Sequence, residues 1–258
     1  MNTPNKLLRK VNRFIGKRRA LYYAKVDKAS LWNKIDGKIV DELNSVMHKD
    51  NEGSILTGKR GVRVMAENID YKLFLRNPSL VAICEQVRFI SSLLSGIKPN
   101  RIIEIGTHKG MFCYLVSLYD NTIEIDTFGN LFESQKAVDI LNAKFGTHIN
   151  FIYGDSQNTF REYAAEKVID FAWVDGGHSY EVCTSDLINC RRLNIPHIAV
   201  DDYVRENAVK KSVHDFIKQT GYAIGGRSNF AIDGRGIVYL RDKTVRRPTS
   251  ANKGNGCR

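Results

Sequence analysis

The sequence predicts an α/β fold built on a mostly parallel sheet, and three observations lead to it. From residue 101 onward, short apolar runs alternate with stretches of helical period, the pattern of strands connected by helices. Polar turns containing glycine or aspartate follow several of these runs, as expected where strands end at one edge of a sheet. A polar loop joins the last two apolar runs, which indicates a terminal antiparallel hairpin.

The expected strands are short, and the expected helices lie between them. Seven strands are predicted, at 101–105, 123–128, 149–154, 168–177, 197–202, 222–226 and 236–240. Helices are predicted at 110–119, 131–146, 157–165, 179–192 and 206–219. A strong apolar period over 78–96, ending at Gly96, predicts a further helix that leads into the first strand.

One α/β domain with two flanking segments is the expected organisation. Residues 78–241 form the predicted domain, 1–77 a helical and loop-like extension, and 242–258 a basic tail whose composition indicates disorder. Within the extension, apolar residues of 7–15 follow one helical face and are surrounded by Lys and Arg. Such a helix either covers the domain or makes peripheral contact with an anionic membrane surface.

Composition excludes several classes of protein. With 43% hydrophobic residues among 258, the chain can bury a core and is not globally disordered. No apolar run approaches the roughly 18 residues of a spanning helix, and no secretory signal is expected at the N-terminus. Five cysteines without a CxxC pair favour reduced thiols in a cytoplasmic protein over a structural zinc site.

The net charge of +11 is unevenly distributed along the chain. Residues 1–100 hold 19 Lys and Arg against 9 Asp and Glu, and residues 242–258 hold 5 against 1. Residues 101–241 hold 15 against 18, so the predicted sheet region is slightly acidic. A basic protein invites a nucleic-acid interpretation, but the acidic middle of the chain argues against nucleic acid as the partner.

The first turn, Glu104–Gly110, contains two glycines separated by three residues. Gly106 allows a tight turn, and Gly110 allows close approach of backbone to a ligand or of helix to strand. Glu104 would repel a phosphate at this place and attract an amine, which argues against a dinucleotide pyrophosphate. An ordinary strand-to-helix turn is the alternative.

Acids also follow the next two strands. Asp126 is placed at the end of the second strand, where an acid can accept hydrogen bonds from a ribose diol. Asp155 and Ser156 follow the third strand and could line an adenine edge. Each of these residues could instead be a turn former or a helix cap. Their common position at strand ends favours a ligand site.

The fourth and fifth strands end in three carboxylates, Asp175, Asp201 and Asp202. If they converge at one edge of the sheet, they repel one another unless a cation is present or their pKa values are raised. Oxygen ligands of this kind suit Mg²⁺, Ca²⁺ or Mn²⁺. His178 follows Asp175 closely enough to act as a general base near such an ion. A capping role for Asp201 or Asp202 is the alternative.

In this order, these residues resemble the class I S-adenosylmethionine-dependent methyltransferases over about residues 78–241. The similarity is closest to the small-molecule and sugar O-methyltransferases that use a divalent cation. It implies a Rossmann-like fold in which Glu104 neighbours the methionine amino group. It also implies that the glycine turn, with Gly106, Thr107, His108 and Gly110, wraps the cofactor.

The same resemblance assigns the remaining turns. Asp126 would bind the ribose, and Asp155 with Ser156 would contact adenine. Asp175, Asp201 and Asp202 would hold the metal ion, with Mg²⁺ expected first and Mn²⁺ as the alternative. Either His178 or a metal-bound carboxylate such as Asp175 would take the acceptor proton. Tyr180, Tyr203 and Arg205 are expected near the acceptor.

The resulting hypothesis is an enzyme that moves a methyl group from S-adenosylmethionine to a hydroxyl of a small molecule, preferably a sugar or another polyol. Two alternatives stay open. One is a metal-independent methyltransferase that acts on a nucleic acid or a protein and docks through the basic flanks. The other is a non-catalytic protein that keeps the fold and binds the cofactor.

Overall fold

A computed structural model describes residues 31–45, 78–228 and 236–244. The first of these segments forms the 3₁₀ helix η1 (Leu31–Lys34) and helix α2 (Gly37–Ser45). The predicted amphipathic helix within 7–19 and most of the predicted basic tail lie outside the described residues. Strand β7 reaches Asp242, one residue beyond the expected end of the domain.

The sheet has seven strands in the order β3-β2-β1-β4-β5-β7-β6, so the predicted fold class is confirmed. The strands are β1 (Arg101–Ile105), β2 (Glu124–Gly129), β3 (His148–Tyr153), β4 (Phe171–Val174), β5 (His197–Val200), β6 (Tyr222–Arg227) and β7 (Val238–Asp242). Strands β1 to β5 are parallel, whereas β7 pairs antiparallel with both β5 and β6. The chain order reverses between β1 and β4, which is where ligands bind in open α/β sheets.

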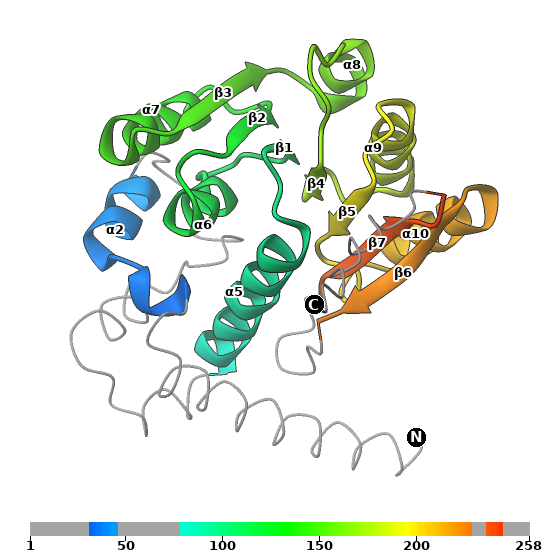
Figure 1. Cartoon of the computed structure of the whole chain (residues 1–258), viewed down its shortest axis with the longest axis horizontal. Helices are drawn as coiled ribbons and strands as arrows, with labels where there is room; N and C mark the ends of the chain where they lie inside the picture. The colour runs from blue at the N-terminus through cyan, green and yellow to red at the C-terminus, as the bar shows by residue number, and fades with distance from the viewer. Residues whose placement is uncertain (1–30, 46–77, 229–235, 245–258) are drawn as a thin grey trace, which may run out of the picture.

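Helices cover both faces of the sheet (Figure 1). The helices are α5 (Pro78–Ile97), α6 (Met111–Tyr119), α7 (Ser134–Phe145), α8 (Ser156–Glu162), α9 (Tyr180–Arg192) and α10 (Asn207–Gln219). One buried apolar cluster joins α2, α5, α6 and α7 to the sheet, and a second joins α9 and α10 to the opposite face. Strands β1 and β4 supply residues to both clusters and are therefore fixed from both sides.

Local sequence explains where the connecting helices begin and end. Gly110 is the N-cap of α6 with a positive φ of 68°, and Gly146 ends α7 with a φ of 64°. Ser179 caps α9 by accepting a hydrogen bond from the Val182 backbone N–H. The turns after β1 and β4 lie at the same edge of the sheet because the two strands pair in parallel. In the described part of the chain, no helix has the length and apolar character needed to cross a bilayer.

Candidate active site

A cavity of about 960 Å³ opens at the carboxyl ends of the parallel strands. The turns after all five parallel strands contribute to its wall, through Glu104–Lys109, Phe128–Leu131, Gly154–Ser156, Asp175–His178 and Asp201–Asp202. The cavity therefore joins the predicted cofactor turn to the predicted metal ligands. Of the predicted site residues, Gly110 and Asp126 are outside this lining set.

The glycine turn after β1 is fixed by contacts that leave no space for a side chain. Gly106 has a φ of 104°, and a Cβ there would lie 2.0 Å from the backbone oxygen of Asp175. Its N–H donates to the Phe128 carbonyl oxygen at 2.9 Å. The turn is thus in direct contact with the end of β2 and with the turn after β4, and only glycine fits this backbone without displacing them.

Glu104 is buried in strand β1 and belongs to the cavity lining. Its Oε2 accepts a hydrogen bond from the Cys113 thiol at 2.9 Å and another from the Thr127 hydroxyl. Burial raises the pKa of Glu104 to about 7, although both hydrogen bonds act against that rise. A cationic ligand group beside Glu104 would favour its ionised form.

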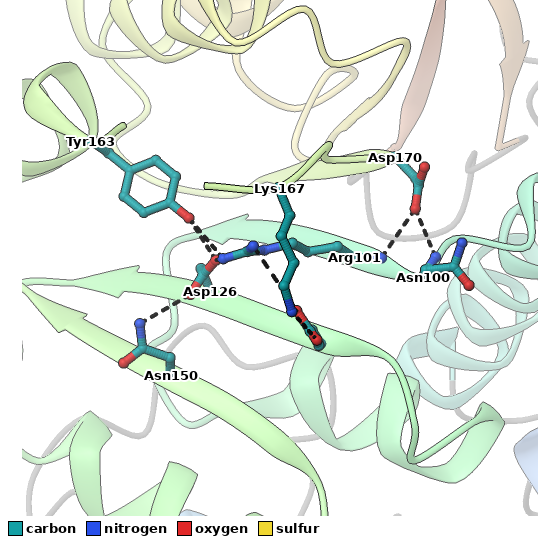
Figure 2. Close-up of polar contacts among 8 residues, drawn as sticks. Asn100, Arg101, Asp126, Asn150, Tyr163, Lys167 and Asp170 are labelled. Atoms are coloured by element: carbon teal, nitrogen blue, oxygen red, sulfur yellow. Dashed lines mark hydrogen bonds and ion pairs between the residues drawn. The ribbon is translucent and has the colours of Figure 1, made fainter. Parts of the chain in front are cut away.

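Asp126 does not end β2, as the sequence analysis expected, because the strand continues to Gly129. Its Oδ2 accepts hydrogen bonds from Arg101 at 2.6 Å and Tyr163 at 2.7 Å, and its Oδ1 accepts one from Asn150 at 3.0 Å. Figure 2 shows Arg101, Asn150 and Tyr163 converging on this carboxylate. Asp126 therefore belongs to a polar cluster outside the cavity lining.

The pKa of Asp126 reflects this surrounding cluster. Burial raises it, but hydrogen bonds from Tyr163, Asn150 and Arg101, with the Arg101 charge, bring it below its ordinary value. The residues that follow β2 into the cavity are Asn130 and Leu131. The sequence analysis did not single them out because it assigned the ribose contact to Asp126, although the strand that it predicted already ran to residue 128. The usable signal was Gly129 at the end of β2.

Asp155 and Ser156 line the cavity where the resemblance places adenine. The Asp155 carboxylate also accepts a hydrogen bond from the Gln157 backbone N–H at 2.9 Å, which makes it the N-cap of α8. The capping role considered from sequence is therefore real. With the Asp155 carboxylate used as a cap, the backbone of this turn and the Ser156 side chain are the groups available to a ligand.

The turns after β4 and β5 bring three potential ligand groups together. Asp175, His178 and Asp202 each offer an atom such that all lie within 4.8 Å of one another. The His178 Nε2 lies 3.1 Å from the Asp202 Oδ2. Asp202 Oδ1 is buried and has no hydrogen-bond partner among the described residues. A buried carboxylate oxygen without a hydrogen-bond partner can bind a cation or accept a hydrogen bond from a ligand.

Asp201 lines the same cavity but is outside that close group. Its Oδ1 accepts a hydrogen bond from the Asp202 backbone N–H at 2.8 Å. Asp202 has a positive φ of 53°, and the hydrogen bond that its N–H donates to Asp201 stabilises this unusual backbone. Asp201 is thus a direct neighbour of the ligand group, and its role as a ligand itself stays a prediction.

Only one of the three residues expected near the methyl acceptor lines the cavity. Arg205 lines the cavity. Tyr203 is buried and its hydroxyl pairs with His214 at 2.9 Å, while the Tyr180 hydroxyl donates to Asp215 at 3.2 Å. Neither tyrosine is among the lining residues. Lys109 lines the cavity and is buried, a feature that sequence reasoning did not use.

Residues 103–203 match a family described as a methyltransferase domain. The match runs from β1 to the turn after β5, so it contains every turn that lines the cavity. A comparison of the sequence with curated proteins gives no match.

Solved structures of the same fold agree with this match. Cofactor-bound Rv0187 from MTB is 12% identical with a TM-score of 0.57, and the alignment covers 87% of this chain and 95% of that one. A proposed O-methyltransferase from Klebsiella pneumoniae is 11% identical with a TM-score of 0.56, covering 87% and 94%. A proposed caffeoyl-CoA O-methyltransferase from Staphylococcus aureus is 16% identical with a TM-score of 0.51, covering 80% and 98%.

Proposed function

We propose that this protein transfers a methyl group from S-adenosylmethionine to a hydroxyl of a small molecule, preferably a sugar or another polyol, with the help of a divalent cation. The observation that carries the proposal is one cavity that holds both the glycine turn of β1 and the group Asp175, His178 and Asp202. The methyltransferase domain match over residues 103–203 supports it. Two of the structures named above are proposed O-methyltransferases, which agrees with oxygen as the acceptor atom.

The residues around Gly106 fit the methyl donor. S-adenosylmethionine supplies a methyl group on a sulfonium cation and leaves as S-adenosylhomocysteine. Glu104 would pair with the donor amine, because it is a buried carboxyl group in the cavity lining whose ionised form a cation favours. Asn130 takes the ribose position that the sequence analysis gave to Asp126, since Asn130 follows the true end of β2.

The residues after β4 and β5 fit a cation and an acceptor. A divalent cation supplies a charge that holds two vicinal oxygens and lowers the pKa of the attacking hydroxyl. Asp175 and Asp202 would hold this ion, and Asp202 Oδ1, which has no hydrogen-bond partner among the described residues, could supply one oxygen ligand. His178 lies beside them with half of its side chain exposed, and it accepts the acceptor proton.

The experiment measures binding and turnover separately. We expect S-adenosylhomocysteine to bind in calorimetry, and we expect turnover on sugars, polyols or catechols to need Mg²⁺ or Mn²⁺. The Asp175→Asn variant should bind S-adenosylhomocysteine normally and lose turnover by about 100-fold or more, since it weakens the ion site. The matched control is Asp139→Asn, because Asp139 is an exposed residue of α7.

Three results would contradict parts of this proposal. Turnover that is undiminished by EDTA, together with an active Asp175→Ala variant, would contradict the proposed cation site. Turnover on a nucleic acid or protein in place of small molecules would replace the acceptor class. Preferential binding of NAD over S-adenosylhomocysteine would contradict the proposed methyltransferase activity.

A further inference from the structure

Glu104 accepts two hydrogen bonds, and both end on the same oxygen. Cys113 of α6 donates its thiol proton to Oε2 at 2.9 Å, and Thr127 of β2 donates its hydroxyl proton to the same atom. These are the hydrogen bonds that the described residues give to this carboxyl group, so Oε1 is the oxygen available to a ligand. Because Glu104 belongs to the cavity lining, such a ligand is one bound in the cavity.

The two donors lie behind the cavity wall. Thr127 and Cys113 are completely buried, and neither belongs to the lining residues. The parallel pairing of β1 with β2 sets Thr127 beside Glu104, and α6 places Cys113 against the same carboxyl group. Thr127 and Cys113 can therefore influence a ligand in the cavity only through Glu104.

A third hydroxyl group determines the direction of the hydrogen bonds. Thr107 Oγ1 lies 2.6 Å from Thr127 Oγ1, and Thr107 lines the cavity. An ionised carboxylate can only accept, and a threonine hydroxyl has a single proton to give. When Glu104 is ionised, Thr127 therefore donates to Glu104 and accepts from Thr107. Accepting this bond strengthens the one that Thr127 donates, because bonds in such a chain polarise one another.

The groups around Glu104 allow it to ionise near neutral pH. Burial raises its pKa to about 7, although the hydrogen bonds from Cys113 and Thr127 lower it. Burial and the Glu104 charge hold the pKa of the Cys113 thiol well above its ordinary value, so Cys113 keeps its proton and remains a donor. The register partners of Glu104 are Thr127 of β2 and Trp173 of β4, which are uncharged. The turn after β1 adds the charged side chain of Lys109 to the same wall.

We propose that Thr127 and Cys113 are positioning residues for Glu104, which hold Oε2, favour the ionised carboxylate and present Oε1 to the ammonium group of the methyl donor. A carboxylate whose orientation is already fixed loses little freedom when the ammonium group binds. Neither positioning residue contacts the ligand. This inference rests on the proposed function, because it assigns the residues that prepare Glu104 for the donor amine.

The experiment compares S-adenosylhomocysteine with its desamino analogue, in which hydrogen replaces the α-amino group. At pH 7 the native protein should prefer the first by roughly 30-fold in calorimetric dissociation constant, as a hydrogen bond between charged groups implies. Thr127→Val has a similar shape and no hydroxyl, and it should reduce this preference by about 5-fold, because the neutral form of Glu104 becomes more favourable. The reduction should shrink at pH 8.5, where a carboxyl group of higher pKa is ionised as well.

Three further variants complete the comparison. Cys113→Ala removes the other donor and should reduce the preference in the same way, so it decides the question if Thr127→Val does not fold. Thr127→Ser keeps a hydroxyl group and should restore the native preference. Thr147→Val is the matched control, because Thr147 is buried between α7 and β3 and its hydroxyl donates to Asn142 at 2.9 Å. It should keep the full preference.

The outcomes separate this inference from the proposed function. An equal loss of affinity for both ligands in Thr127→Val, with the preference unchanged, means a purely structural role and overturns the inference alone. A reduced preference that is the same at pH 7 and pH 8.5, or native binding that ignores the amine, also overturns it alone. No binding of S-adenosylhomocysteine by the native protein overturns the proposed function and this inference with it.

Discussion

Acids on the two sides of the cavity differ in how they are paired. On the β1–β2 side, Glu104 accepts hydrogen bonds from Cys113 and Thr127, and nearby Asp126 accepts them from Arg101 and other donors. On the other side, both oxygens of Asp186 and one oxygen of Asp202 have no partner in the described part of the chain. Buried acids on the first side therefore have hydrogen-bond partners, whereas two buried acids on the other side keep carboxylate oxygens without one among the described residues.

This difference distinguishes acids that stabilise the folded protein from acids that can bind a ligand. A satisfied buried acid holds its neighbours in place, and removing one partner destabilises the protein. An unsatisfied buried acid destabilises the ligand-free protein, and a bound cation, proton or donor group offsets that cost. Substitutions of these acids or of their partners on the two sides should therefore change the free energy of unfolding in opposite directions.

The largest effect is expected at Gly106, where the two sides touch. Gly106→Ala places a Cβ 2.0 Å from the Asp175 carbonyl oxygen on a backbone with a φ of 104°. We expect a loss of about 4 kcal/mol in the free energy of unfolding from steric overlap and strain. Binding of S-adenosylhomocysteine should disappear as well. Urea unfolding and calorimetry measure the two effects.

The control for this prediction is a second glycine with similar backbone geometry. Gly146 has a φ of 64° and no atom within 4 Å of its missing Cβ. Gly146→Ala should cost only about 1 kcal/mol and keep binding intact, because strain acts there without overlap. Equal effects of the two substitutions would show that contact between the turns is unimportant.

Sequence alone predicts the fold well and the site less well. The apolar run 101–105 coincides with β1, because a strand buried on both faces needs a continuous apolar segment, and the run 222–226 coincides with most of β6. Strand ends are less certain from sequence, since hydrogen-bond register decides them. Strand β2 ends at Gly129, one residue beyond the predicted end, and Asp126 lies within the strand and outside the cavity lining, so its predicted contact with a ribose stays a prediction.

Side-chain direction was the other unpredictable quantity. Asp175 and Asp202 were predicted to converge and do so, whereas Asp201 turns toward the Asp202 backbone. Asp186 lies within an ordinary helical stretch, and only the three-dimensional contacts of α9 show that it is buried without partners. Sequence spacing identifies the strand ends that meet, but it does not show which side chains find partners there.

The paired side is tested by Arg101→Met, with an intermediate expected effect. This substitution leaves Asp126 buried without its cationic partner, although Tyr163 and Asn150 still donate to it. We expect a loss of about 3 kcal/mol in the free energy of unfolding at pH 7, the usual result of breaking a buried ion pair. Affinity for S-adenosylhomocysteine should be unchanged, because the cluster is outside the cavity lining.

Acid should reduce the difference between this variant and the native protein. The pKa of Asp126 lies below its ordinary value in the folded state, so its stabilising contribution is present at neutral pH. That contribution is lost as the pH falls through the folded pKa, so the stabilities of the two proteins should approach one another in acid, below the ordinary pKa of an aspartate. A lost affinity in the folded variant would instead place the cluster in the binding site.

The unpaired side is tested by Asp186→Asn, and here the sign of the stability change should reverse. Burial raises the pKa of Asp186 from 3.8 to about 7, so the folded protein binds a proton that the unfolded chain has released. Stability of the native protein therefore falls as the pH rises from about 4 to about 7 and stays reduced above that range.

The amide carries no charge and escapes this loss, although it is still buried without partners. We expect Asp186→Asn to be more stable by about 2 kcal/mol at pH 8 and nearly equal to the native protein at pH 4. Urea unfolding at both pH values measures this, with Asp139→Asn unchanged as the control, and a variant less stable than the native protein at pH 8 would mean that the fold itself uses this carboxylate.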